Sequence, residues 1–105
     1  MKKYLSEGIS LGSCTDNNTA IEKDPNYTVA YYNRANSKRN LGDYRGALLD
    51  YNKVIENNPN DADAYHNRGL IKIELGDKES GCLDLSKAGE LGDAQAYDAI
   101  KQFCK

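Results

Sequence analysis

The chain has 105 residues and a formal net charge of −2, values that fit one small domain. Neither sign of charge forms a block of five residues, so the sequence lacks the basic stripe of a nucleic-acid-binding protein. It also lacks the ~20-residue apolar run of a membrane-spanning helix. Hydrophobic residues make up 39% of the chain and include eight tyrosines, which suits a thin helical stack with half-buried aromatic side chains.

The N-terminal segment has some features of a bacterial lipoprotein signal. Two lysines follow Met1, and Leu-Gly-Ser at 11–13 precedes Cys14, which would carry the lipid. A signal also needs a continuous apolar run of about seven or more residues. That run is interrupted at Ser6, Glu7, Gly8 and Ser10. The sequence therefore favours a cytoplasmic protein, and the alternative is a periplasmic or envelope lipoprotein anchored through Cys14.

A repeat with one fixed period runs through most of the chain. Ala30-Tyr31 recurs as Ala64-Tyr65, and the Leu-Gly-Asp triplet at 41–43 recurs at 75–77. The same offset relates Asn33-Arg34 to Asn67-Arg68, Lys38 to Lys72, Leu49-Asp50 to Leu83-Asp84, Lys53 to Lys87, and Glu56 to Glu90. The register also extends backward, because Pro25 and Pro59 are separated by this offset as well. One offset held without a gap over so many positions indicates a stack of similar structural units.

The period and the recurring residues resemble the tetratricopeptide repeat (TPR) family, whose units are about 34 residues long. In residues 28–61 the signature places hold Tyr31, Ala35, Leu41, Gly42, Asp43, Tyr44, Ala47, Tyr51 and Pro59. In residues 62–93 they hold Tyr65, Gly69, Leu75, Gly76, Asp77, Leu83 and Ala88. The chain departs from the family at four charged positions, Arg34, Lys38, Arg68 and Lys72, where the family has apolar or aromatic residues. We expect looser packing around these four side chains.

The resemblance implies an all-α fold, a right-handed α-solenoid of antiparallel helical hairpins with a C-terminal capping helix. We expect one domain with a partial, degenerate N-terminal repeat at 1–27, TPR repeats at 28–61 and 62–93, and a capping helix at 94–105. A truncated first repeat leaves the next hairpin uncovered. We therefore expect residues 1–12 to be loosely held or to pack against another copy of the chain, which makes a homodimer through the N-terminal end an alternative function.

Each repeat carries local signals for two helices and a turn. In the first repeat the first helix is expected from about Val29 to Asn40. Gly42 and Gly76 suit a left-handed backbone conformation in which a side chain would be strained. Asp43 and Asp77 are suited to cap the second helix. Small residues predict a close approach of the two helices at Ala35, Ala47, Gly69 and Gly81.

The segment from Ala94 to Lys105 is expected to be the capping helix. Its apolar side contains Ala96, Tyr97, Ile100 and Phe103. Cys82 and Cys104 are each eleven residues from Asp93, in helices that should run antiparallel around that turn. They can form a disulfide or remain two buried thiols in a reducing cytosol, and we favour the thiols. Their spacing is not a Cys-x-x-Cys pattern, so we predict no metal site.

Many TPR proteins bind a peptide along the surface formed by the first helices of successive repeats. Carried over to this sequence, the register places the partner-binding residues at Tyr32, Asn33, Asn36, Asn40, His66, Asn67 and Leu70. It places Val29, Asp63 and Glu74 on the same face. Asn33 and Asn67 are the most informative, because an amide can both donate to and accept from the backbone of an extended peptide.

One subgroup of TPR domains holds the acidic C-terminal tails of chaperones in a two-carboxylate clamp. Asn33 or Asn67 matches the middle element of that clamp. The capping helix, however, offers Gln95 and Ala99 where the clamp needs lysine and arginine. We therefore do not expect this clamp.

The predicted function is a non-catalytic scaffold that binds a protein or peptide segment, without a cofactor and without nucleic acid. His66 is the only histidine, and as a base it would need a nucleophile or carboxylate partner in a pocket. We expect it instead to be a solvated residue of the groove. Most acidic residues have a lysine or arginine within a few positions, which predicts a solvated surface with i,i+4 pairs.

Overall fold

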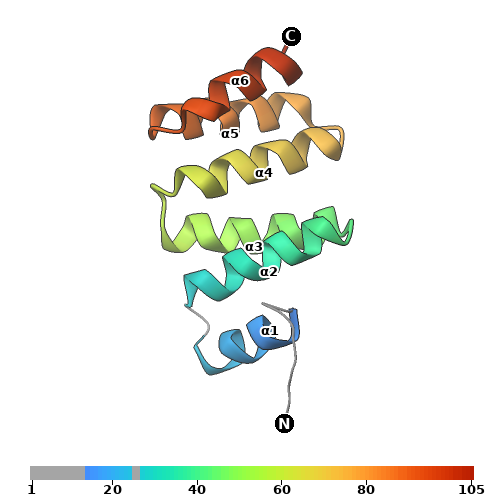
Figure 1. Cartoon of the computed structure of the whole chain (residues 1–105), viewed down its shortest axis with the longest axis vertical. Helices are drawn as coiled ribbons and strands as arrows, with labels where there is room; N and C mark the ends of the chain where they lie inside the picture. The colour runs from blue at the N-terminus through green and yellow to red at the C-terminus, as the bar shows by residue number, and fades with distance from the viewer. Residues whose placement is uncertain (1–13, 25–26) are drawn as a thin grey trace.

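The computed structural model describes residues 14–24 and 27–105, and Figure 1 shows their helices stacked in chain order from the N-terminal to the C-terminal end. The helices are α1 (Cys14–Lys23), α2 (Thr28–Asn40), α3 (Tyr44–Asn57), α4 (Ala62–Glu74), α5 (Lys78–Glu90) and α6 (Ala94–Phe103). The stack measures 50 × 24 × 21 Å, and each helix packs mainly against its neighbours in the sequence. The prediction of an all-α solenoid of helical hairpins is confirmed.

The turns follow the local signals of the sequence. Gly42 and Gly76 have φ angles of 85° and 93°, in the left-handed region that favours glycine. The carboxylates of Asp43 and Asp77 accept hydrogen bonds from the backbone N–H groups of Gly46 and Ser80, at 3.0 and 3.2 Å. These predictions are confirmed, and the same pairing of glycine and aspartate recurs at Gly92 and Asp93 before α6.

The crossings of paired helices rely on small residues, as predicted. Ala35 and Ala47 are fully buried in a cluster with Tyr51 and Ile71. In the next hairpin, a Cβ atom added to Gly69 would lie 2.7 Å from the backbone oxygen of Gly81. A Cβ atom added to Gly81 would lie 2.6 Å from the oxygen of Gly69. Helices α4 and α5 therefore touch backbone to backbone at this point.

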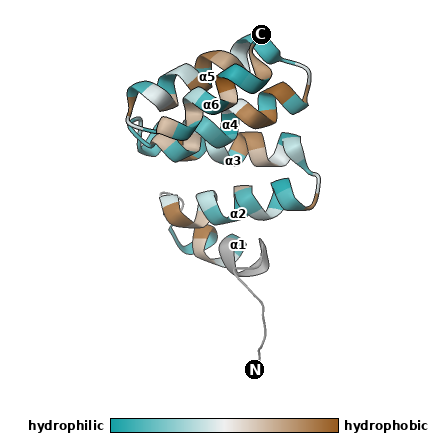
Figure 2. Cartoon of the chain, turned by 45° about the horizontal axis from the view of Figure 1, so that its top comes forward, coloured by the Kyte–Doolittle hydropathy of each residue, from teal (hydrophilic) through white to brown (hydrophobic). Residues whose placement is uncertain are grey.

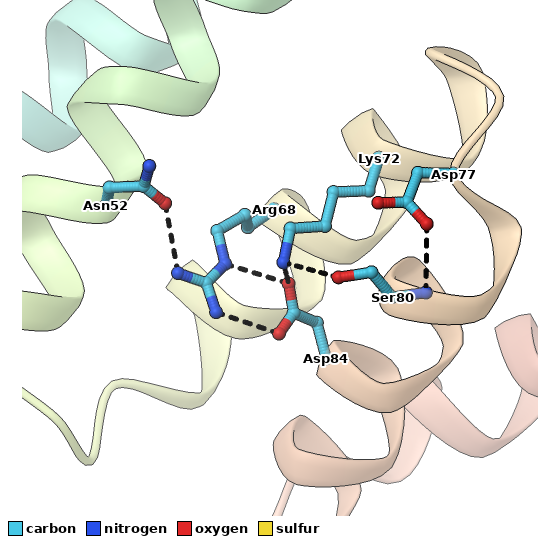
Figure 3. A network of polar contacts seen from close by, with 6 residues as sticks. All are labelled: Asn52, Arg68, Lys72, Asp77, Ser80 and Asp84. Carbon is cyan, nitrogen blue, oxygen red and sulfur yellow. Dashed lines mark hydrogen bonds and ion pairs between the residues drawn. The ribbon is translucent and has the colours of Figure 1, made fainter.

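A polar network joins the two helices of the second repeat (Figure 3). Arg68 on α4 holds both carboxylate oxygens of Asp84 on α5, with Nε–Oδ2 and Nη2–Oδ1 distances of 2.8 Å. Lys72, one turn further along α4, lies 3.0 Å from the same carboxylate and donates to Ser80 Oγ at 2.9 Å. The hydrogen bonds to Asp84 raise the pKa of the Arg68 guanidinium. A buried carboxylate with two cationic partners avoids the cost of an unpaired charge.

The first repeat contains the same network, one repeat period earlier in the chain. Arg34 Nε and Nη2 lie 2.8 and 2.7 Å from the two carboxylate oxygens of Asp50, and Lys38 Nζ lies 3.4 Å from one of them. The guanidinium carbon of Arg34 also lies 5.6 Å from the ring centroid of Tyr31, and the second repeat has the equivalent contact. In each hairpin the two helices are thus joined by the same set of charged side chains.

The remaining nitrogen of each arginine reaches back to the preceding hairpin. Arg34 Nη1 donates to Asn18 Oδ1 on α1 at 2.7 Å, and Arg68 Nη1 donates to Asn52 Oδ1 on α3 at 3.0 Å. Asn18 and Asn52 are themselves one repeat period apart. Each network therefore connects the helices of one repeat and also ties that repeat to the one before it.

The structure corrects two predictions about charged residues. The arginines and lysines do not loosen the packing, because they neutralise Asp50 and Asp84, which are only 3% and 6% exposed. These two aspartates are not solvated i,i+4 partners either, because their arginines lie 16 residues away on the facing helix. Sequence distance could not reveal this pairing, since the hairpin turn is what brings the two positions face to face.

The capping helix α6 buries only part of the apolar side that was predicted, since Ala96 is buried and Ile100 is half-buried. Ala96 and Ala99 are buried, whereas Tyr97 is 51% exposed and Phe103 is 38% exposed. Tyr97 lies over Gly89 of α5, where a side chain would collide with the tyrosine ring. Small residues occupy the buried positions of α6 because this helix packs closely on α5.

Cys82 on α5 and Cys104 after α6 are joined by a disulfide, with the sulfur atoms 2.06 Å apart and the Cα atoms 6.0 Å apart. The structure thus has the disulfide and not the two buried thiols that the sequence analysis favoured. The bond closes a loop with a sequence separation of 22 residues. It fastens the end of α6 to the start of α5.

Several predictions concern the N-terminal end, which lies largely outside the described residues. Residues 1–13 include most of the lipoprotein features and the segment expected to be loosely held. The lipoprotein and homodimer alternatives therefore stay predictions. Within the described ranges, no helix combines the length and the apolar character needed to cross a bilayer.

Candidate interaction groove

The predicted partner-binding residues lie on α2 and α4, the first helices of the two repeats. Asn67 on α4 connects these helices through its amide. Its Nδ2 donates to the hydroxyl of Tyr32 at 3.1 Å, and its Oδ1 accepts from Arg39 Nη1 at 3.0 Å. Both of these partners belong to α2, so the side chain of Asn67 holds the two helices in a fixed relation.

A second polar contact lies beside the first. The hydroxyl of Tyr51, whose side chain is fully buried, donates to Asn36 Oδ1 on α2. The rings of Tyr32 and Tyr51 pack edge to face with centroids 5.9 Å apart. The ring of Tyr32 is thus held by an aromatic neighbour and, through its hydroxyl, by Asn67.

Burial changes the acidity of both tyrosines. It raises the pKa of Tyr51 to about 12, although the charge of Arg39 acts in the opposite direction. Burial also raises the pKa of Tyr32, and the nearby carboxylate of Asp63 adds to that increase. Both hydroxyls therefore remain protonated at neutral pH and can hold their hydrogen bonds.

The asparagines predicted to bind a partner differ in their surroundings. Asn36 and Asn67 are half-buried and engaged in these contacts, whereas Asn33 and Asn40 are exposed. Asn67 uses one N–H and one lone pair of its amide, which leaves the second N–H and the second lone pair for a ligand. Its first role in the structure is to join α2 to α4.

Three cavities lie along the two helices. The first, the Asp63 cavity, has a volume of about 350 Å³ and is lined by Thr28, Val29, Tyr32, Asn58, Asp61 and Asp63. The second, the Arg39 cavity, has about 400 Å³ and is lined by Arg39, Asn40, Tyr44, Leu70, Ile71 and Glu74. The third, the Phe103 cavity, has about 220 Å³ and is lined by Leu70, Ile73, Glu74 and Phe103. We call the surface with these cavities the α2–α4 groove.

The predicted residues are therefore brought together only in part. Tyr32, Asn40 and Leu70 line the cavities of the groove. Leu70 is shared by two cavities, as is Glu74, so the Arg39 and Phe103 cavities adjoin each other. A strip of surface thus runs from α2 over α4 toward the capping helix.

His66 has a different environment from the solvated one that was expected. Its Nδ1 lies 2.6 Å from Asp93 Oδ2, and the two side chains are only 17% and 13% exposed. The other oxygen of Asp93 accepts from the backbone N–H of Gln95 and so caps α6. His66 therefore ties α4 to the start of the capping helix, and it lines none of the three cavities.

Sequence reasoning missed several groove residues, of which Arg39 is the most important. Arg39 lies three residues after Asn36 and seven after Tyr32, so helical spacing alone places it on the same face of α2. Tyr44 and Phe103 gave no such signal. They belong to α3 and to the end of α6, and only the stacking of the helices brings them to the groove.

The groove carries more negative than positive charge. Among the residues that line the three cavities, Asp61, Asp63 and Glu74 bear carboxylates, and Arg39 bears the single guanidinium. The acidic residues occupy both ends of the groove. Arg39 is also held by its hydrogen bond to Asn67. Cationic or neutral segments therefore fit the electrostatics of this surface better than acidic ones.

Comparison with known proteins agrees with this architecture. Two family models, both described as tetratricopeptide repeat, match residues 28–61 and 50–82 and together span more than half of the chain. No curated protein sequence matches the chain.

Solved structures resemble most of the stack. The first TPR of Spaghetti (RPAP3), bound to the HSP90 peptide SRMEEVD, superposes with a TM-score of 0.81 at 22% sequence identity. That match covers 87% of this chain and 74% of the other. The crystal structure of MamA gives a TM-score of 0.73 at 25% identity and covers 80% of this chain. This chain spans 49% of the MamA chain, about half its length.

Proposed function

We propose that this chain, which belongs to the tetratricopeptide repeat family, is a scaffold that binds an extended peptide or protein segment in the α2–α4 groove. The observation that carries the proposal is the row of three cavities along the first helices of successive repeats. The RPAP3 domain with the same fold was solved with a bound peptide, which supports this assignment.

The shape of the groove suits an extended backbone. Side chains two residues apart in an extended segment point the same way and are separated by about 7 Å. The Arg39 and Phe103 cavities share Leu70 and Glu74 and can therefore receive two such side chains. Exposed Asn40 at the rim of the Arg39 cavity can bond to the backbone between them.

The rigidity of the groove favours binding as well. Asn67 fixes α2 against α4, and Tyr51 fixes Asn36 beneath the surface. A surface whose side chains are already ordered loses less conformational entropy when a ligand binds. The polar contacts under the groove thus contribute to affinity without touching the ligand.

The ligand should differ from the peptide held by RPAP3. The peptide SRMEEVD contains three acidic side chains, and the groove of this chain offers Arg39 against three carboxylates. Like charges across an interface lower affinity. We therefore expect the α2–α4 groove to discriminate against acidic peptides of this kind.

The test begins with a library of displayed random nonapeptides selected on the intact chain. Soluble versions of the enriched peptides are then titrated against Leu70→Ala, which truncates the side chain shared by two cavities. We expect a roughly tenfold increase in Kd, which corresponds to about 1.4 kcal/mol.

The matched control is Leu49→Ala, a substitution on α3 where the side chain is 68% exposed and lines none of the three cavities. Its Kd should stay within about twofold of the parent value. Circular dichroism verifies that both variants remain helical. Equal affinity of the enriched peptides for the parent chain and for folded Leu70→Ala would show that the groove is not the binding site.

A further inference from the structure

We infer that the Asp63 cavity selects a lysine or arginine side chain of the segment that binds the α2–α4 groove. This inference rests on the proposed function and adds the chemistry of one position of the ligand. The cavity lies where α2 and α4 begin, and it combines an apolar wall with two carboxylates. Val29 contributes to that wall although it is 55% exposed.

The apolar wall suits the stem of a long cationic side chain. Lysine and arginine carry three or four methylene groups below the charged head, and these groups gain from contact with apolar surface. Val29 and Tyr32 offer such surface in the Asp63 cavity. Tyr32 is also held in place by Tyr51 and Asn67, so the wall exists before the ligand arrives.

The carboxylates supply the charge that a cationic head needs. Asp61 uses one oxygen to cap α4, where it accepts from the backbone N–H of Ala64 at 3.1 Å, and its second oxygen is available. Asp63 is exposed and forms no ion pair with the residues that the structure describes. The carboxylate of Asp63 also contributes to raising the pKa of Tyr32, which lines the same cavity.

Competing charges do not cancel this field. The residues that line the Asp63 cavity include no lysine, arginine or histidine. The N-terminal ends of α2 and α4 contribute a positive partial charge of about half a unit each. Two full negative charges outweigh them, so an anionic side chain is disfavoured and a cationic one is favoured. Long apolar side chains fit the wall but leave the carboxylates without a partner.

The test compares peptide selections on three forms of the full chain. Random displayed nonapeptides are selected on the parent chain, on Asp63→Asn and on Glu74→Gln. Both variants replace one groove carboxylate by an amide and have the same net charge. Only Asp63→Asn alters the Asp63 cavity, because Glu74 lines the other two cavities.

We expect peptides from the parent chain to be enriched at one position in lysine or arginine. This preference should persist on Glu74→Gln and be largely lost on Asp63→Asn. Replacing the preferred lysine by norleucine in one enriched peptide should weaken binding to the parent chain roughly threefold, a size typical of a partly exposed ion pair. The same replacement should have a clearly smaller effect on binding to Asp63→Asn, in which Asp61 is the remaining carboxylate of the cavity.

The outcomes separate the two proposals. Enriched peptides without a basic preference, or with a preference that survives in Asp63→Asn, would overturn the inference about the cavity and leave binding in the groove intact. A selection that enriches no peptide on any form of the chain would contradict the proposed function itself.

Discussion

The two helical hairpins that form the first and second repeats, α2 with α3 and α4 with α5, share one polar network but differ in the interior beside it. In the first repeat, buried Tyr51 donates its hydroxyl proton to Asn36. The equivalent positions in the second repeat are Leu85, which is fully buried, and Leu70. A polar pair in one hairpin is thus replaced by an apolar pair in the other. Figure 2 shows the related difference in hydropathy, since α2 is largely hydrophilic and hydrophobic segments recur on α4 and α5.

The helix crossings differ in the same way. The first repeat has Ala35 and Ala47 where the second has Gly69 and Gly81, and the glycines let the backbones of α4 and α5 touch. Both repeats nevertheless carry the arginine, lysine and aspartate of the network at the same positions. Equivalent interior positions of the two repeats can hold different residues, because apolar groups only need to fill space. The positions of the network cannot change in this way, because a buried carboxylate must keep its cationic partners.

The largest expected effect comes from removing the aspartate of either network. Asp50→Ala and Asp84→Ala should each lower the free energy of unfolding by about 3 kcal/mol, because they strand a partly buried arginine and lysine. This value is at the low end for buried pairs, since the side chains of Arg68 and Lys72 remain 17% and 19% exposed. Urea denaturation measures the change.

Replacing the whole network is the matched control. The combination of Arg68→Met, Lys72→Met and Asp84→Leu leaves no unpaired charge and should change stability by less than about 1 kcal/mol. The networks would not have the role described here if Asp84→Ala were as stable as the parent chain.

The disulfide distinguishes the second repeat and the capping helix from the first repeat. Cys104→Ser should lower the free energy of unfolding by about 3 kcal/mol, the value expected from chain entropy for a loop of this length. Amide hydrogen exchange should accelerate mainly in α5 and α6. A thiol titration of the denatured, unreduced chain should find Cys14 alone free, and three free thiols would exclude the bond.

The pH dependence of stability should separate the repeats further. Tyr51 has a pKa of about 12 in the folded chain and an ordinary value near 10 in the unfolded chain. Its contribution is complete below pH 10 and is lost as the pH rises through 12, because the unfolded chain releases the proton first. The loss should approach about 2 to 3 kcal/mol.

The control for this effect is Tyr51→Phe, which brings the first repeat closer to the apolar interior of the second. Guanidinium unfolding between pH 9 and 12 should show a shallower fall in stability for this variant than for the parent chain. Parallel pH profiles for the two proteins would mean that Tyr51 does not titrate as its burial implies.

The smallest expected effects come from exchanging alanine and glycine at the crossings. Gly69→Ala and Gly81→Ala should each cost about 1 kcal/mol, because the overpacking of the backbone contact exceeds the gain in helix propensity. Ala35→Gly and Ala47→Gly should also lose about 1 kcal/mol, through backbone entropy. Thermal denaturation of all four variants tests whether each helix crossing is most stable with its native residues. A higher stability of Gly69→Ala or Gly81→Ala than of the parent chain would argue against the close approach of α4 and α5.

The sequence by itself determined the helices, their turns and their order. These features depend on residues within a few positions of one another, such as Gly42 with Asp43, or on a period that can be counted directly. The same period placed Tyr32, Asn40 and Leu70 on the face that carries the three cavities.

The partners of the polar side chains that pair over long sequence distances were decided by the tertiary structure alone. Arg34 meets Asp50 across 16 residues, His66 meets Asp93 across 27, and Asn67 meets Tyr32 across 35. The sequence shows what each of these side chains can bind, but several candidates of suitable chemistry compete for every one. Stacking the hairpins removes that ambiguity, because the packing of whole helices fixes which side chains come within hydrogen-bonding distance.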